Sequence, residues 1–238
     1  MQDDDVYALR VCVLFALPEE AAPFRKQRPS CNWIVSLGVS GPGSGNAAKH
    51  AALLLDDPGP KIKCLIICGF AGGLSPELRP GDLILAAQVQ HNSQPILLPD
   101  STLFAATGSA PSKTPLHKAS LLTVGHVVIH AAEKRALVAQ THAEAVDMET
   151  YSAAEVAEER GIPWLALRAV TDGADDDLPL DFNALTSPDG SLHRGRIVAA
   201  TLARPWKIPA LLRLGKRSAL AAGNLAAFLE SLLQNLPD

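Results

Sequence analysis

The stretch that decides the fold is Ile62-Lys-Cys-Leu-Ile-Ile-Cys-Gly-Phe-Ala-Gly-Gly-Leu74. Its first seven residues are almost all apolar, which is typical of a strand buried on both faces of a parallel sheet. The glycines that follow, from Gly69 to Gly73, predict a tight turn where this strand ends. Because ligands of open parallel sheets bind beyond the carboxyl ends of the strands, this turn is a candidate binding site.

Apolar runs elsewhere predict strands of the same kind, and helical patterns fall between them. The predicted strands are 7–17, 33–37, 83–89, 124–129 and 164–170, and the predicted helices include 131–139, 145–160, 192–203 and 218–233. The polar, Pro-rich stretch 91–120 predicts no element. Alternating strands and helices predict one α/β domain over 1–238, with a mainly parallel, mixed central sheet flanked by helices.

Composition excludes several classes of protein. The chain has 238 residues, of which 47% are hydrophobic and 19% charged, so it is neither disordered, collagen-like nor a coiled coil. No apolar run reaches the roughly 18 residues of a membrane span. The acidic start, Met1–Asp5, is unlike a signal peptide. We therefore expect a cytoplasmic protein.

The sequence predicts no metal, no organic cofactor and no nucleic-acid partner. The four cysteines, Cys12, Cys31, Cys64 and Cys68, lack metal-site spacing. The glycine-rich loop 41–45 is followed by Asn46 where a dinucleotide fingerprint requires glycine. A dehydrogenase is therefore disfavoured.

Three carboxylates occupy positions that suggest chemistry. Glu20 follows the first strand, Asp172 ends the strand from Trp164, and Glu149 falls in the apolar stripe of the helix 145–160. Each carboxylate also has a simpler, structural explanation. Glu20 could favour the positive end of a helix dipole, Asp172 could be the N-cap of a helix, and Glu149 could form a buried ion pair with Arg168. Their convergence on one end of a sheet favours acid–base chemistry on an uncharged, hydroxyl-rich substrate.

Four motifs, in order, resemble the purine nucleoside phosphorylase/nucleosidase superfamily, and most of all its methylthioadenosine/S-adenosylhomocysteine nucleosidase branch. They are Leu17–Glu20, Gly69–Leu74 with Leu78–Asp82, Ala145–Glu149, and Leu167–Asp172. Two looser motifs, Ser187–Gly190 and Arg204–Arg213, resemble the hopanoid-associated branch, which removes adenine from adenosylhopane. The resemblance implies cleavage of the N-glycosidic bond of an adenosine derivative, with adenosylhopane as the expected substrate, in a homodimer.

The resemblance also implies roles for individual residues. Glu20 would activate the attacking water, and Asp172 would protonate the departing purine at N7. Glu149 would hydrogen-bond the ribose hydroxyls, and Arg168 would orient Glu149. The residues implied to contact substrate are Leu17, Phe70, Ala71, Gly72, Ile129, Met148, Glu149 and Arg168.

Some positions depart from the family. Ile67 and Phe70 stand where phosphorylases place Arg and Ser to hold phosphate, which favours water as the nucleophile. Val128 replaces an aromatic residue that stacks on the base; His126 and His130 lie near it and are expected to be mainly structural. Phosphorolysis of the same bond, methylthioadenosine/S-adenosylhomocysteine hydrolysis, and non-catalytic nucleoside binding stay open as alternatives.

The C-terminal segment 190–238 is basic and apolar. Seven cations and no acid lie between Gly190 and Leu229, although the net charge of the chain is −4. The residues 204–217 suit an interfacial segment on anionic lipid, which a lipid-linked nucleoside substrate would require. The alternative is a helix that packs on the domain with a solvated basic face.

Overall fold

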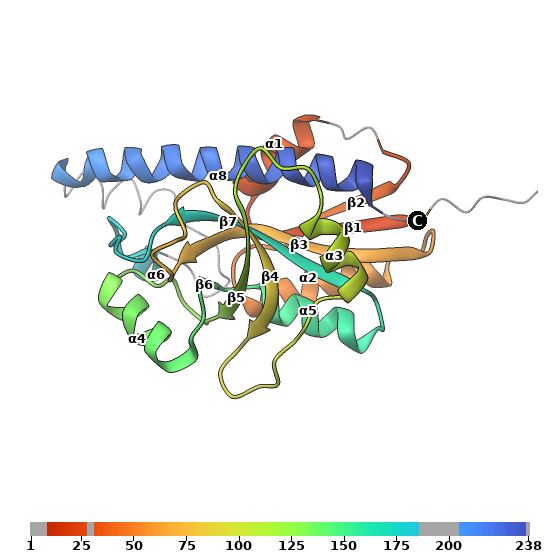
Figure 1. The fold of residues 1–238 in the computed structure, drawn as a ribbon, viewed down its shortest axis with the longest axis horizontal. Helices are drawn as coiled ribbons and strands as arrows, with labels where there is room; N and C mark the ends of the chain where they lie inside the picture. The colour runs from red at the N-terminus through yellow and green to blue at the C-terminus, as the bar shows by residue number, and fades with distance from the viewer. Residues whose placement is uncertain (1–8, 28–30, 186–204, 237–238) are drawn as a thin grey trace, which may run out of the picture.

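The computed structural model describes residues 9–27, 31–185 and 205–236 (Figure 1). A mixed sheet of seven strands, in the order β2-β1-β3-β6-β5-β4-β7, forms its centre. The strands are β1 (Arg10–Phe15), β2 (Ile34–Val39), β3 (Ile62–Gly73), β4 (Leu83–Gln90), β5 (Leu116–Thr123), β6 (Ala145–Asp147) and β7 (Trp164–Asp172). Pairing is antiparallel between β3 and β6 and between β4 and β7, and parallel elsewhere. The predicted α/β fold with a mainly parallel, mixed sheet is confirmed.

The sheet closes on itself over five of its strands. Strand β7 pairs with β4 on one side and with β3 on the other, so β3, β6, β5, β4 and β7 form a ring. Strands β1 and β2 extend the sheet from β3. This closure brings the ends of β3, β6 and β7 together, which positions the site described below.

Helices cover both faces of the sheet (Figure 1). Helices α1 (Pro18–Gln27) and α8 (Ile208–Asn235) pack on one face, and α2 (Ser44–Asp56) and α5 (Thr150–Glu159) on the other. The shorter elements are α3 (Ser101–Gly108), α4 (Ala131–Thr141), α6 (Phe182–Leu185) and the 3₁₀ helix η1 (Pro205–Lys207).

Two hydrophobic clusters hold these layers, and alternate residues of each strand belong to different clusters. In β1, Cys12 and Leu14 face α2 and α5, whereas Val11, Val13 and Phe15 face α1 and α8. Successive side chains of a strand point to opposite faces, so a strand covered by helices on both sides must be apolar throughout. This explains why the apolar runs at β1, β3 and β7 predicted strands correctly.

Four predictions made from the sequence were wrong. The stretch 116–123 forms β5 although it lies mostly in the segment for which no element was predicted, and 124–129 is a loop rather than a strand. The predicted helix 145–160 begins with the short strand β6, which lies between β5 and β3. Strand β3 continues through Gly69 to Gly73, because its glycine-rich end pairs with both β7 and β6.

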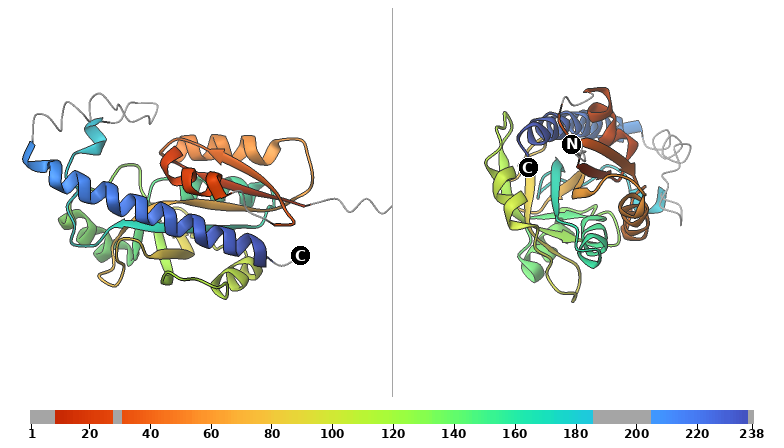
Figure 2. Two further views of the ribbon diagram at one scale, coloured as in Figure 1. Left: turned by 90° about the horizontal axis from the view of Figure 1, so that it is seen from above. Right: turned by 90° about the vertical axis from the view of Figure 1, so that its right-hand side faces the viewer.

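The C-terminal helix is longer than predicted. The predicted helix 218–233 lies within α8, whose first turns extend beyond the sheet (Figure 2). The predicted helix 192–203 and the motif Ser187–Gly190 lie outside the described residues. Among the helices that the structure describes, none is long and apolar enough to cross a bilayer.

Candidate active site

A cavity of about 1010 Å³ opens where the carboxyl ends of β1, β3, β6 and β7 meet. The predicted residues Glu20, Glu149 and Asp172 all line it, although they come from three separate parts of the chain. The loop Pro42–Asn46 and the loop Val124–Val128 complete much of the wall. The three carboxylates singled out from the sequence therefore share one cavity.

Glu20 lies in the first turn of α1 and is only 2% exposed. Its carboxylate accepts hydrogen bonds from the backbone N–H groups of Ala16 (3.0 Å), Leu17 (2.8 Å) and Phe70 (2.8 Å). Burial raises the pKa of Glu20, while nearby Arg168 and these N–H groups oppose the rise. A buried carboxylate with a raised pKa is a stronger base than an exposed one, as proton abstraction from water requires.

Glu149 is the N-cap residue of α5, directly after β6, and not a mid-helix residue as predicted. Its Oε1 accepts a hydrogen bond from the Gly43 N–H (2.7 Å), and its Oε2 accepts a weaker one from the Met148 N–H (3.3 Å). Gly43 has a φ of 93°, which L-residues rarely adopt. Burial is the main reason that the pKa of Glu149 rises to about 7; Arg168 opposes it.

Arg168 is fully buried in β7, and its short contacts differ from those predicted. Its Nη2 lies 2.6 Å from Asp147 Oδ2 and 2.6 Å from Thr150 Oγ1, whereas its Nη1 lies 3.9 Å from Glu149 Oε2. Arg168 therefore pairs primarily with Asp147, which was not singled out from the sequence. Its Nη1 has no hydrogen-bond partner within the described ranges.

Gly69 makes this arrangement possible. A Cβ at this position would lie 2.2 Å from Arg168 Nη1, closer than real side-chain contacts allow, and 3.1 Å from Glu20 Oε1, which is a tight contact. The guanidinium occupies the space that a side chain would fill, beside both Glu20 and Glu149. The unused N–H of Arg168 is therefore available between two carboxylates.

Asp172 ends β7 and is 5% exposed. Its Oδ1 accepts a hydrogen bond from the Thr171 hydroxyl (2.7 Å), and its Oδ2 lies 2.5 Å from Lys134 Nζ. Lys134, on α4, is fully buried and also donates to the Gly173 carbonyl (2.6 Å). Sequence reasoning missed Lys134, because a lysine in a predicted helix ordinarily lies in solvent.

Most of the other predicted contact residues line the cavity, and two do not. Those that line it are Leu17, Phe70, Ala71, Gly72 and Met148. Arg168 and Ile129 are both buried and are not among the lining residues; the Ile129 carbonyl accepts a hydrogen bond from the Leu178 N–H (2.8 Å). Val128 does line the cavity.

The two histidines near Val128 differ in position. His126 lines the cavity, and its Nε2 lies 2.6 Å from Glu133 Oε1. His130 does not line it and is exposed. Sequence reasoning also missed the polar residues Ser44, Asn46 and Asn183 and the apolar residues Leu178, Phe182 and Leu214, because they come from loops and from α2, α6 and α8.

The charge of the lining is one-sided. Carboxylates contribute to the wall from Glu19, Glu20, Asp147, Glu149 and Asp172, whereas no Lys or Arg is among the lining residues that the structure describes. Ile67, one of the two positions that would hold phosphate in phosphorylases, is buried and does not line the cavity. Such a wall favours an uncharged or cationic ligand over an anion. In the described parts of the chain, no group of three or more His, Cys, Asp or Glu could hold a metal ion.

Fold and cavity together define an α/β protein with an acidic small-molecule site at the carboxyl ends of its strands. The chain belongs to the Phosphorylase superfamily, whose family model matches residues 10–203. The superfamily resemblance of the sequence motifs is thereby confirmed.

Relatives of known name are nucleosidases. The chain is 28% identical over 183 residues to the 5'-methylthioadenosine/S-adenosylhomocysteine nucleosidase of Shewanella halifaxensis, covering 68% of this chain and 78% of that one. It is 29% identical over 141 residues to the aminodeoxyfutalosine nucleosidase of Helicobacter pylori, covering 52% of this chain. That match spans only 61% of the Helicobacter protein.

Solved structures share the fold. The native futalosine hydrolase of Helicobacter pylori superposes with a TM-score of 0.73 at 17% identity, covering 96% of this chain and 99% of that one. The 5'-methylthioadenosine/S-adenosylhomocysteine nucleosidase of Neisseria meningitidis, in complex with methylthio-immucillin-A, gives 0.73 at 17% identity and covers 95% and 99%.

Proposed function

We propose that this protein is a nucleosidase that hydrolyses the N-glycosidic bond of an adenosine derivative and releases adenine. The observation that carries the proposal is the convergence of Glu20, Glu149 and Asp172 on one cavity without lysine or arginine in its described lining. The names of the relatives support the same activity. Binding alone needs no acid and base, so the three carboxylates together favour an enzyme over a binding protein.

Glu20 is the residue that we assign to activation of the attacking water. Cleavage of an N-riboside places positive charge on the sugar, and a water must lose a proton as it attacks the anomeric carbon. Glu20 lines the cavity and has the raised pKa of a base, so we assign it the proton that the water loses. Glu149, ionised, would accept hydrogen bonds from the ribose hydroxyls and stabilise the cationic sugar.

The leaving-group side of the site is Asp172. The departing purine gains negative charge, which a proton delivered to N7 neutralises. Asp172 lines the same cavity as Glu20 and Glu149, and a Cβ at Gly72 would lie 3.3 Å from Asp172 Oδ2. We assign Asp172 the role of handing that proton to the purine.

Water is favoured over phosphate as the nucleophile. Phosphate requires cationic or N–H-rich surroundings, and the described lining carries carboxylates with no lysine or arginine. Phe70, at the second of the phosphate positions, presents an aromatic ring instead of a hydroxyl.

The test is adenine release from adenosine, 5'-methylthioadenosine and adenosylhopane, each with and without 10 mM phosphate as an added co-substrate. Release at the same rate in both conditions would support hydrolysis. Strict dependence on phosphate would replace hydrolysis with phosphorolysis of the same bond. No release from any substrate in either condition would overturn the enzyme and favour a nucleoside-binding protein.

We further propose that the substrate is lipid-linked, with adenosylhopane as the candidate. The cavity volume of about 1010 Å³ is at the upper end of the roughly 300–1,000 Å³ that drug-sized ligands occupy. Leu178, Phe182 and Leu214 add apolar surface to it. A long apolar group on the ribose 5′ carbon would fit this extra space.

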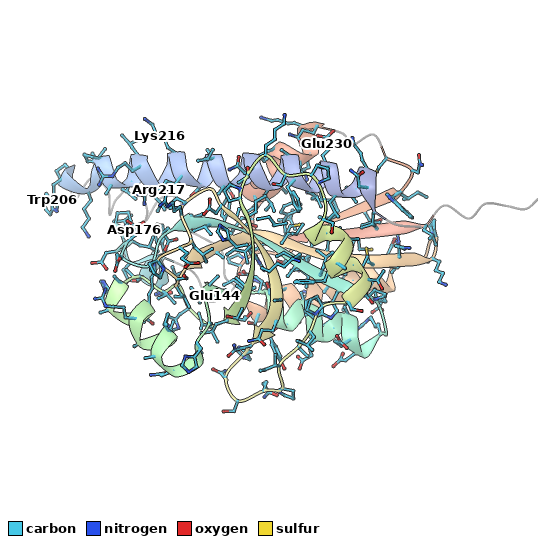
Figure 3. All side chains as sticks on the ribbon, viewed as in Figure 1. Glu144, Asp176, Trp206, Lys216, Arg217 and Glu230 are labelled. Atoms are coloured by element: carbon cyan, nitrogen blue, oxygen red, sulfur yellow. The ribbon has the colours of Figure 1, made fainter. Side chains whose placement is uncertain are left out.

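The start of α8 supports contact with a membrane. Trp206 and Leu212 are 72% and 62% exposed, and Trp206 lies at the free end of the helix in Figure 3. Lys216 points away from the body, while Arg217 pairs with Asp176 at 2.8 Å (Figure 3). Leu214 of the same helix lines the cavity. A helix that offers apolar and basic side chains beside the cavity would suit extraction of a substrate from anionic lipid.

Liposome flotation tests the membrane contact. The intact protein should float with vesicles that contain about 30% phosphatidylglycerol, because the headgroups attract basic side chains. A variant with Lys207, Arg213, Lys216 and Arg217 changed to Gln should lose this binding. The matched control, with the exposed Arg25, Lys26, Arg79 and Lys113 changed to Gln, removes the same charge elsewhere and should still float. Equal flotation of both variants would contradict the proposal.

A further inference from the structure

Lys134 is a buried cation, and among the described residues its ion-pair partner is Asp172. It belongs to α4, where its neighbours Ala132 and Arg135 are exposed, yet its own side chain has 0% exposure. Nζ lies 2.5 Å from Asp172 Oδ2 and 2.6 Å from the Gly173 carbonyl. Lys134 does not line the cavity, whereas Asp172 does. Any influence of Lys134 on a bound ligand must therefore pass through Asp172.

The burial of Lys134 calls for a reason. Removing an ammonium ion from water costs several kcal/mol even after relaxation, and a buried ion pair is often no more stable than apolar residues of the same size. Two short, charge-assisted hydrogen bonds offset much of this cost. Apolar side chains could stabilise the fold as well as the Lys134–Asp172 ion pair does. Stability alone therefore does not explain why this ion pair lies at the cavity wall.

We propose that Lys134 is a positioning residue that fixes the Asp172 carboxylate and supplies the proton that Asp172 passes to the departing base. The inference rests on the proposed nucleosidase function and deepens it. Lys134 Nζ lies 2.5 Å from Asp172 Oδ2, which is within hydrogen-bond reach for a direct proton transfer. The other carboxylate oxygen already accepts a hydrogen bond from Thr171. The ammonium of Lys134 is thus the adjacent proton source.

The step balances in atoms and charge. A proton moves from Lys134 Nζ to Asp172 and on to the purine N7, while the C1′–N9 bond breaks and its electron pair goes to the purine. Water bonds to C1′ and gives a proton to Glu20. After product release Glu20 loses that proton to solvent, and Lys134 takes one up, so the net reaction is nucleoside plus water to adenine plus sugar.

Three substitutions separate the parts of this role. Lys134→Met removes the charge but keeps length and volume, Lys134→Gln keeps a hydrogen-bond donor without a transferable proton, and Lys134→Arg keeps the cation. We expect Met and Gln to lower kcat for 5'-methylthioadenosine at least about 100-fold, with KM within about threefold of the wild type. Arg keeps the charge-assisted pairing but does not release its proton, so its loss of kcat should match that of Gln, and wild-type kcat in Lys134→Arg would overturn the proton supply.

A double-mutant cycle with Asp172→Asn gives a readout that a purely structural role would not move. Because Lys134 acts only through Asp172, adding Lys134→Met to Asp172→Asn should cause no further loss of kcat. Arg135→Met, an exposed cation on the same helix, is the matched control and should retain wild-type kcat. Circular dichroism and thermal unfolding establish that each variant folds; if Met does not, Gln takes its place in the cycle.

The outcomes distinguish this inference from the proposed function. Wild-type kcat in Lys134→Met, or losses that add to those of Asp172→Asn, would overturn the role of Lys134 and leave the nucleosidase intact. Full activity in Lys134→Gln would overturn the proton supply alone. Absence of adenine release by the wild type would overturn the proposed function, and with it this inference.

Discussion

Lowering the pH from 7 to 5 should reduce kcat/KM of the proposed nucleosidase about 50-fold, because Glu149 must be ionised to act. Burial raises the pKa of this carboxyl to about 7, against the opposing effect of Arg168. The protonated form can neither accept both ribose hydrogen bonds nor stabilise a cationic sugar. Activity should therefore rise with pH and level off above about 7.

The magnitude follows from titration. At a pH equal to its pKa about half of a carboxyl is ionised, and two pH units lower roughly 1% is, which gives the loss of about 50-fold. Burial also raises the pKa of Glu20, and its ionised form is the one that accepts a proton from water. Both carboxylates thus act in the same direction, so the fall in activity should be at least this steep.

The raised pKa of Glu149 makes the stability of the protein change with pH in the opposite direction to its activity. The pKa of Glu149 is about 7 in the folded protein and has an ordinary value of 4.5, so the folded state binds more protons between these values. The free energy of unfolding therefore decreases as the pH rises through this window, by about 3 kcal/mol for this one group. Glu149→Gln should abolish most activity yet stabilise the protein at pH 8.

Two measurements test the reasoning. Initial rates of adenine release give kcat/KM from pH 5 to 9, and urea unfolding at pH 5 and 8 compares the wild type with Glu149→Gln. Glu77→Gln, an exposed carboxylate outside the cavity, is the control and should change neither profile. A flat kcat/KM between pH 5 and 7, or a wild-type pH dependence of stability in Glu149→Gln, would refute the argument.

Three further predictions concern single side chains. Gly69→Ala should destabilise the protein by about 1–3 kcal/mol and lower kcat/KM, since its Cβ would lie 2.2 Å from Arg168 Nη1; Gly223→Ala in α8, with open space around it, is the control for urea unfolding. Asp172→Asn should lower kcat at least about 100-fold while the nucleoside Kd by calorimetry stays within about threefold; unchanged turnover would remove Asp172 from the mechanism. Thr107→Val should raise the unfolding free energy by about 1 kcal/mol, because the buried Thr107 hydroxyl has no partner in the described structure, and a lower value would show that the hydroxyl is satisfied.

Local amino-acid composition was sufficient to predict some strands but not others. Strands β1, β3 and β7 are covered on both faces, so their apolar sequences identify them without reference to the rest of the chain. Strand β5 reads Leu-His-Lys-Ala-Ser-Leu-Leu-Thr, and its polar first half hides a strand whose existence depends on β4 and β6 beside it. Conversely, the apolar residues of 124–129 form a loop at the cavity, which only a backbone contact from Val124 N–H to Asp147 (2.8 Å) ties to β6 among the described residues.

Sequence motifs identified the three carboxylates of the site, but the residues that surround these carboxylates lie in other parts of the chain. Glu20 and Asp172 follow or end strands that the sequence predicts, so their place at one edge of the sheet could be inferred. The lipid-linked substrate and the catalytic roles stay predictions with the tests given above, and the homodimer stays a prediction. Arg168 was expected to serve Glu149, yet its shortest ionic contact is with Asp147.

The sequence by itself therefore determined the α/β class, the principal strands and three acidic positions at the strand ends, because each depends on a local pattern of apolar residues, glycines and motifs. Only the tertiary structure decided which cations neutralise those acids. Lys134 meets Asp172 across 38 residues, and Gly69 lies against Arg168 from a neighbouring strand. Such pairings depend on strand order, burial and distances of a few ångströms, which no local pattern contains.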